Sequence, residues 1–185
     1  MLLSPATIAA MKNTLHKSTL LAVGILLGAL LGGCTPTHDW REIRQERPSF
    51  SVLMPAKPSS QTREIKLGEA KVSMTMTAVE VDHATYAVGS VELADSKAAK
   101  DAMLQMKTAL VGRLDNKIRK EDIVDNPTES RIDVEAVGTP KGESRIVIAR
   151  FIAQEKYAYQ IVLTGPEKTV TRDQIDTFMT SFKTK

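Results

Sequence analysis

Apolar residues in this chain alternate over several stretches and recur with a helical period of about 3.6 residues over two others. Alternation is typical of half-buried strands, whereas the helical period is typical of amphipathic helices. The order along the chain is strands, helix, strands, helix. This order predicts an α+β fold class, an antiparallel β-sheet packed by two main helices. With 185 residues, 42% of them hydrophobic, the chain is long enough for one such domain with its own core.

The strand pattern predicts a sheet built largely from hairpins. A first short strand begins near residue 48 and is closed by two prolines, which cannot donate to a central ladder. A β-bulge is expected at residues 78–79, where the alternation slips from one parity to the other. A later strand covers residues 132–136. The expected connections between paired strands lie at residues 67–69, 82–83 and 154–156.

Two stretches predict helices. The first covers residues 95–114, with Asp95 or Ser96 as its amino-terminal cap. The second begins after Thr171, which has capping-box spacing to Gln174. Each helix has one apolar stripe that would pack on the sheet: Ala99, Met103, Met106 and Leu110 in the first, and Ile175, Phe178, Met179 and Phe182 in the second.

The amino-terminal segment has the layout of an export signal. After Met11, a basic segment with Lys12 and Lys17 is followed by an apolar run over residues 20–31 and by two glycines. A helix that crosses a membrane needs about 20 apolar residues, and this run is shorter. The uncharged stretch over residues 18–37 is longer, so the alternative is an inner-membrane anchor made by an uncleaved helix.

Cys34, the only cysteine, directly follows this segment. The sequence LGGC at residues 31–34 resembles the lipobox of bacterial lipoproteins, which has an aliphatic residue three positions before the cysteine and small residues between. The resemblance implies that residues 1–33 are a signal peptide, cleaved between Gly33 and Cys34, and that Cys34 carries the lipid that anchors the chain to the bilayer. Because Thr35 and not aspartate follows, it also implies the periplasmic face of the outer membrane of a Gram-negative bacterium.

The mature chain would begin at Cys34 whichever start is used. Residues 1–10 precede a second methionine and add nothing to the signal, which is consistent with an over-extended start. Without Lys12 and Lys17, the chain has 23 basic and 22 acidic side chains, a net charge of +1. This balance argues against a nucleic-acid partner, since nucleic-acid binders concentrate basic residues on one face.

Residues 34–47 are expected to form the lipidated cysteine and a polar tether, because the stretch is charged and carries a single aromatic residue. That residue, Trp40, is expected to pack on the edge of the domain; a ligand-stacking role is the alternative. Residues 48–185 are then expected to form a single periplasmic α+β domain. Since Cys34 is consumed by the lipid, this domain would be stabilised by packing without disulfides.

Several stretches of the expected domain resemble a known fold. FSVLMPAKPSSQTREI, TYAV, the helix that follows and FMTSFKTK together resemble, over residues 47–183, the Mog1/PsbP-like α+β fold of small bacterial envelope lipoproteins. The resemblance implies a role in binding or assembly. It supplies no shared catalytic motif that could be carried over to residues of this chain.

Residues with catalytic potential are few. Nucleophilic catalysis needs a serine or cysteine beside a base, and the mature chain offers only His38 in the tether and His83 in a turn. A serine, His83 and Asp82 could form a triad. His83 and Asp82 are, however, more simply interpreted as surface residues. No zinc-site spacing or phosphate loop is present, and residues 137–144 are interpreted as a turn. No cofactor or metal is therefore expected.

Four methionines are considered as metal ligands, and three carboxylates are considered as a paired set. Thioethers select Cu(I), so the methionines suggest a copper site, yet they continue apolar faces and are better explained as core residues. The carboxylates lie in RKEDIVDNPTES, which is interpreted as a polar connection, either a solvated loop or a mobile binding loop. The residues concerned are Met74, Met76, Met103 and Met106, and Glu121, Asp122 and Asp125.

These observations favour a membrane-anchored periplasmic lipoprotein that acts without catalysis. It would be a binding or assembly module for another envelope component, and the expected partner is a protein. One alternative is a carrier of a small apolar ligand in a pocket between sheet and helices. An enzyme is a third interpretation. The lipid bilayer, reached through acylated Cys34, is the other expected partner.

Overall fold

The structure is a computed structural model that describes residues 38–68, 70–112, 117–127, 129–139 and 142–184. The chain divides into two compact units, Met1–Pro36 and Thr37–Lys185, and every described residue belongs to the second. The expected signal peptide over residues 1–33, its expected cleavage site and Cys34 lie outside the described residues. Of the described helices, neither is long and apolar enough to cross a membrane.

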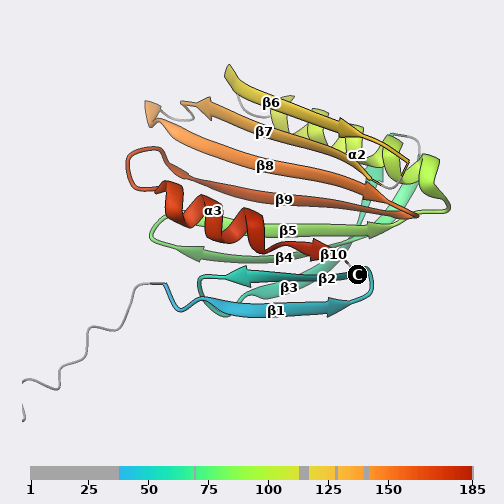
Figure 1. Ribbon diagram of the computed structural model, residues 1–185, viewed down its shortest axis with the longest axis horizontal. Helices are drawn as coiled ribbons and strands as arrows, with labels where there is room; N and C mark the ends of the chain where they lie inside the picture. The colour runs from blue at the N-terminus through green and yellow to red at the C-terminus, as the bar shows by residue number, and fades with distance from the viewer. Residues whose placement is uncertain (1–37, 69, 113–116, 128, 140–141, 185) are drawn as a thin grey trace, which may run out of the picture. The chain divides into compact units, whose positions relative to one another are not determined.

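The unit is built around a seven-stranded antiparallel sheet, with the order β3-β4-β5-β9-β8-β7-β6 (Figure 1). A second sheet has three strands in the order β1-β2-β10. The strands of the large sheet are β3 (Ser59–Leu67), β4 (Ala70–Val81), β5 (Ala84–Glu92), β6 (Lys117–Asp125), β7 (Ser130–Gly138), β8 (Arg145–Gln154) and β9 (Tyr157–Pro166), and those of the small sheet are β1 (Arg41–Glu46), β2 (Ser49–Met54) and β10 (Lys183–Thr184).

Two helices cover opposite faces of the large sheet. Helix α2 (Ser96–Gly112) packs on one face, and helix α3 (Arg172–Ser181) packs with the small sheet on the other (Figure 1). The α+β prediction, with an antiparallel sheet and two main helices, is therefore confirmed.

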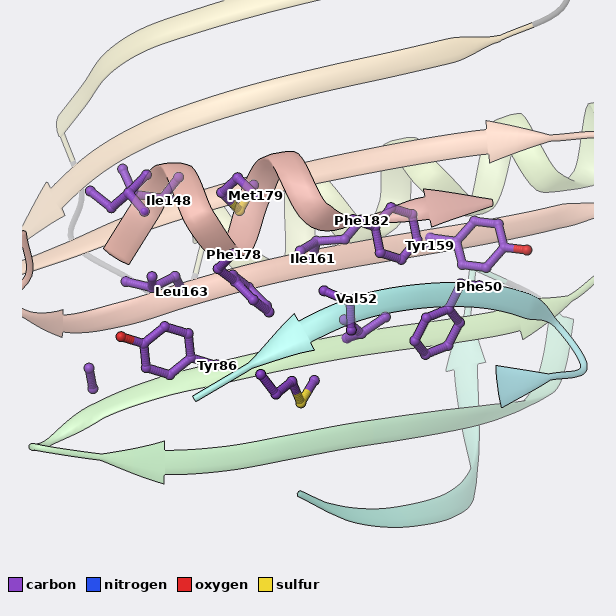
Figure 2. Packing of buried hydrophobic residues seen from close by; sticks show 14 of the residues in the cluster. Phe50, Val52, Tyr86, Ile148, Tyr159, Ile161, Leu163, Phe178, Met179 and Phe182 are labelled. Carbon is purple, nitrogen blue, oxygen red and sulfur yellow. The ribbon is translucent and has the colours of Figure 1, made fainter. Parts of the chain in front are cut away.

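The face under α3 is rich in aromatic residues. Phe178 of α3 is fully buried, and its ring meets that of Tyr86 edge-on at a centroid distance of 5.3 Å. On the same face, Phe182 stacks on Phe50 of β2 at 5.6 Å. Figure 2 shows these side chains pointing into the space between α3, β2 and the large sheet. We call this set the aromatic cluster; its buried members include Phe50, Val52, Tyr86, Ile148, Tyr159, Ile161, Leu163, Phe178, Met179 and Phe182.

The face under α2 is packed mainly with methionine, alanine and valine. Small residues let the helix approach the sheet closely, and the flexible methionines fill the remaining gaps. Gly89 of β5 illustrates the close fit, because a Cβ there would lie 2.2 Å from the terminal methyl of Met74. We call this set the methionine cluster; its buried members include Met74, Val91, Ala99, Ala102, Met103, Met106, Val134, Ala149 and Phe151.

The predicted turns at residues 82–83 and 154–156 and both predicted helix caps are present. Asp82 and His83 join β4 to β5, both with positive φ, and Glu155 has positive φ in the turn between β8 and β9. The Asp95 carboxylate accepts from the Ala98 backbone N–H at 2.8 Å, so Asp95 caps α2. Helix α3 has the complete capping box of Thr171 and Gln174. These local signals were correctly interpreted because each is satisfied within a few residues.

The prediction of a tether over residues 34–47 is wrong from His38 onward. Residues Arg41–Glu46 form β1, which pairs with β2 through six consecutive residues. Trp40 packs against the aromatic cluster and meets the Tyr86 ring edge-on at 5.9 Å, which confirms its predicted place on the domain. The charged sequence of β1 is compatible with a strand because most of its side chains are exposed.

The polar connection expected around residues 119–130 is also wrong for most of its length. Lys117–Asp125 form β6, an edge strand paired with β7. An edge strand can carry charges because water solvates its outer side, and such charges limit pairing with other chains. The mobile-loop interpretation of this stretch is overturned with it.

The bulge expected at residues 78–79 is absent, since β4 pairs with β5 in unbroken register across both residues. The change of parity has another cause. The methionines of β4 face the methionine cluster, whereas Val79 packs against the aromatic cluster on the opposite face. Both faces of the sheet are covered, so apolar residues occur on both. In the described part of the large sheet, a register shift lies in β6, between Ile118 and Lys120.

Candidate binding groove

The sheet face that packs under α3 changes from apolar to charged toward β6. On β8 the residues of this face are Ile146, Ile148, Arg150 and Ile152, so a single arginine interrupts an apolar row. On β7 the paired residues are Val137, Glu135, Asp133 and Arg131, so all but Val137 are charged. Helix α3 covers only part of this face, which leaves a surface groove of about 260 Å³ beside it. We call this feature the charged groove.

Arg150 and Asp133 form the centre of the charged groove. The registered pair joins β8 to β7, with Arg150 Nε donating to Asp133 Oδ1 at 2.6 Å and Nη2 to Oδ2 at 3.3 Å. Arg150 Nη1 also donates to the carbonyl oxygen of Met179 at 3.1 Å, in the last turn of α3. A cation is favoured at a helix carboxyl end, where carbonyl groups lack partners. The guanidinium thus links two strands and a helix.

A second arginine extends the network. Arg131 Nε lies 3.1 Å from Asp133 Oδ2, and its Nη1 lies 3.5 Å from Glu129 Oε1. The Nε atom is buried but is not aligned for a hydrogen bond. Asp133 therefore lies between two guanidinium groups; Arg150 lines the charged groove, whereas Arg131 lines a neighbouring groove.

The rim of the charged groove carries exposed charges of both signs. Arg172, in the first turn of α3, lies 3.7 Å from Glu135, and its side chain is 66% exposed. Lys120 of β6 pairs with Asp122 at 2.8 Å, and the hydrogen bond with this carboxylate raises the lysine's pKa. A neighbouring groove shares Arg150 and includes Phe182 and Lys183. Together these groups could bind a polar segment that presents charges of both signs, because each charge in the groove can exchange its partner for one on a ligand.

Sequence reasoning missed this groove, although one signal for it was visible. Arg150 stands within RIVIARFIAQ, a strand that is otherwise almost entirely apolar. An arginine in an apolar strand needs an acceptor for its charge. This position therefore predicts an anionic partner on a neighbouring strand. The identity of that partner depends on the register of β7 with β8, which the sequence does not supply.

The structure does not assemble the considered triad. His83 lies in the turn between β4 and β5, where its carbonyl oxygen accepts from Arg145 Nη2 at 3.1 Å. The His38 ring lies 3.2 Å from Gln174 Nε2 and stacks on Trp40. Within the described residues, neither histidine ring is hydrogen-bonded to a serine or threonine hydroxyl, and Asp82 shares the turn with His83.

The methionines considered for Cu(I) lie in the methionine cluster. Met74, Met103 and Met106 are buried, and Met76 packs partly buried beside them. The three buried methionines share this cluster with alanine and valine residues, as the core interpretation requires, and the Met76 sulfur accepts from Gln160 Nε2 at 3.7 Å. Across the described part of the chain, no group of three or more His, Cys, Asp or Glu residues is arranged to hold a metal ion.

The three carboxylates of the expected loop are separated by the strand they occupy. Glu121 and Asp125 face α2, where they pair with Lys107 and Lys100. Asp122 points to the opposite face, toward the charged groove. The pKa of Asp125 is lowered by a hydrogen bond from Lys100 and, to a smaller extent, by one from Ser130. Glu121 and Asp125 thus form ion pairs between β6 and α2, and the three carboxylates do not form a paired acid and base.

The pocket required by the carrier interpretation would lie between the sheet and its helices. Side chains of the aromatic and methionine clusters occupy that space in the described part of the chain. The grooves found among the described residues are open at the surface, and the charged groove is lined by several ionised groups.

Comparison with known proteins supplies no family. No protein-family profile and no curated protein matches the sequence. A crystal structure from Bacteroides thetaiotaomicron VPI-5482 aligns with a TM-score of 0.45 and 10% identity. The alignment covers 78% of this chain and 48% of the Bacteroides chain, so this chain spans about half the length of that protein. A Pseudomonas aeruginosa protein of unknown function, PA94, aligns with a TM-score of 0.34 and 13% identity, covering 70% and 84% of the two chains.

Proposed function

We propose that this chain is a lipoprotein anchored through acylated Cys34 to the periplasmic face of the outer membrane, and that its Mog1/PsbP-like domain binds another envelope protein without catalysis. The observation that carries the proposal is the position of Cys34, which follows a basic segment, an apolar run and two glycines. An acylated cysteine confines a domain to a membrane surface, where binding partners gain from high local concentration.

The charged groove is the binding surface that we assign to this partner. Its centre is prearranged by the contacts of Arg150 with Asp133 and Met179, and its rim offers the exposed side chains of Arg172 and Lys120. The outer edge of β6 is a weaker choice, because its register shift and its charges are features that discourage pairing with a further strand. A protein segment with alternating charges fits the groove best.

In-cell photo-cross-linking tests this assignment. A photo-reactive residue replaces Thr180, an exposed residue of the charged groove, and a matched sample carries it at Thr108, an exposed threonine of α2 on the opposite face. We expect a discrete cross-linked protein from Thr180 and none from Thr108. The intact mass of the recovered chain is measured in the same preparation.

Two variants make the result decisive. Arg172→Glu reverses an exposed groove charge while placing a carboxylate in the first turn of α3, where an acidic side chain is favourable. It should therefore abolish the cross-link without unfolding the domain. Cys34→Ala should also abolish it by releasing the chain from the membrane. Equal cross-linking from both threonines, or none from an acylated chain, would contradict the groove; a co-purifying apolar compound would favour the carrier.

A further inference from the structure

The folded domain begins much closer to Cys34 than the sequence suggests. His38 already packs on the domain: its ring stacks on Trp40 at a centroid distance of 5.9 Å and lies 3.2 Å from Gln174 of α3. The next residue is also fixed, since the Asp39 backbone N–H donates to the Pro55 carbonyl oxygen at 2.8 Å. The chain is thus attached to the domain from His38 onward.

This attachment sets the reach of a lipid anchor. From Cys34 to His38 there are four residue steps, and a fully extended chain covers at most about 14 Å over that number. A tether reaching to residue 48, as expected from the sequence, would cover up to roughly 50 Å. The point at which His38 joins the domain must therefore stay within about 14 Å of Cys34, whatever path the intervening residues take.

His38 lies at one defined end of the domain, which we call the proximal end. It contains the first turn of α3, the turn between β4 and β5 with His83, and the loop before α3 with Lys168 (Figure 1). The distal end contains the start of α2 with Lys97 and the turn between β8 and β9. Strand β5, with nine residues, connects the two ends and spans about 30 Å at a rise of about 3.3 Å per residue.

We propose that the proximal end rests on the phospholipid headgroup layer that holds the acyl chains, while the distal end points into the periplasm. This inference depends on the proposed acylation of Cys34. The exposed side chains at this end include both basic and acidic groups, such as Lys168 and Asp82. The short covalent link, and not charge attraction, therefore holds the proximal end to the membrane, and the domain without its lipid has no affinity for vesicles.

Site-specific fluorescence quenching in vesicles tests this orientation. The acylated chain has no free thiol, because its only cysteine is used by the lipid. Lys168→Cys and Lys97→Cys then provide unique labelling positions at the proximal and distal ends, with the same loss of charge. The purified, acylated full-length mature chain is reconstituted in phosphatidylethanolamine and phosphatidylglycerol vesicles in which some headgroups carry a nitroxide quencher. We expect loss of fluorescence at position 168 and little change at position 97.

Two controls separate the possible causes. An insertion of about ten Gly and Ser residues after Thr37 adds up to about 35 Å of reach and should remove the difference between the two labels. The Cys34→Ala chain should show no quenching at either position. Equal quenching at both ends of the acylated chain, or a difference that survives the insertion, would overturn the inference. Intact mass distinguishes this failure from that of the proposed function, since an unacylated Cys34 would refute the anchor itself.

Discussion

The two faces of the large sheet are closed in different ways. Segments from both ends of the described chain close the aromatic face: β2 contributes Phe50, α3 contributes Phe178, and the residue after α3 contributes Phe182. The opposite face is closed by α2, which follows β5 directly and presents alanine and methionine. Segments from distant parts of the sequence thus meet over the aromatic face, whereas a single helix covers the methionine face and packs mainly on β8 and β9.

The difference predicts unequal tolerance to change. Rigid rings in edge-on contact leave a cavity when one is removed, because their neighbours cannot rearrange to fill it. Methionine side chains adapt more readily. Polar attachments differ as well, since Tyr159 is hydrogen-bonded within the aromatic face while lysine-carboxylate pairs border α2.

Removal of a central ring should have the largest effect. Phe178 is fully buried and contacts the Tyr86 ring. We expect Phe178→Ala to lower the free energy of unfolding by about 3–5 kcal/mol, from lost burial and the cavity that remains. Urea denaturation followed by circular dichroism measures this change. A loss below about 1 kcal/mol would mean that the aromatic face can collapse around the gap.

The matching change on the opposite face should cost less. Met103 of α2 is buried in the methionine cluster, and we expect Met103→Ala to lower the free energy of unfolding by about 2–4 kcal/mol. Met103→Leu conserves the volume and should cost less than about 1.5 kcal/mol. A Met103→Ala loss larger than that of Phe178→Ala, in the same denaturation assay, would reverse the proposed ranking of the two faces.

Alkaline pH should weaken the aromatic face selectively. Burial, more than nearby negative charge, raises the pKa of Tyr86 and of Tyr159 to about 12. The unfolded chain releases these protons near pH 10, so this contribution to stability is complete below pH 10 and is lost as pH rises through about 12. Each tyrosine should account for about 1 kcal/mol of lost stability by pH 11. Denaturation between pH 9 and pH 11.5, compared with the double Tyr→Phe variant, should show a shallower decline in the variant.

The two tyrosine hydroxyls should differ at neutral pH. Tyr159 Oη donates to the Ser49 carbonyl oxygen at 3.2 Å, so Tyr159→Phe should cost about 1 kcal/mol. Tyr86 Oη is buried without a hydrogen-bond partner among the described residues, so Tyr86→Phe should be neutral or stabilising. A loss of about 1 kcal/mol in both variants would show that Tyr86 has a partner such as an ordered water.

The smallest effect is expected at the border of α2. Lys107 pairs with Glu121 of β6, and both side chains are about one quarter exposed. Partly screened ion pairs contribute little, so Lys107→Met should change the free energy of unfolding by less than about 1 kcal/mol at low salt. Raising the salt concentration should lessen the difference between wild type and variant. A larger, salt-independent loss would indicate that the lysine stem packs on the sheet.

Elements with strong local signals were predicted well from the sequence. Helix α3 has a complete capping box, and the turn at Asp82 and His83 interrupts an alternating pattern. Strands β1 and β6 were missed because their sequences are charged and their formation depends on pairing with β2 and β7. The charged groove was missed for the same reason. Arg150 stood out in the sequence, but its contact with Asp133 follows from the register of two strands.

Intact mass spectrometry of the chain extracted from the membranes of a Gram-negative host is the first measurement to make, because the anchor supports both proposals. We expect one mature species that starts at Cys34 and carries diacylglycerol and an amide-linked acyl chain. A chain that retains residues 11–33 would contradict this expectation and support an uncleaved membrane helix, in which case neither the short tether nor the membrane-resting proximal end would hold.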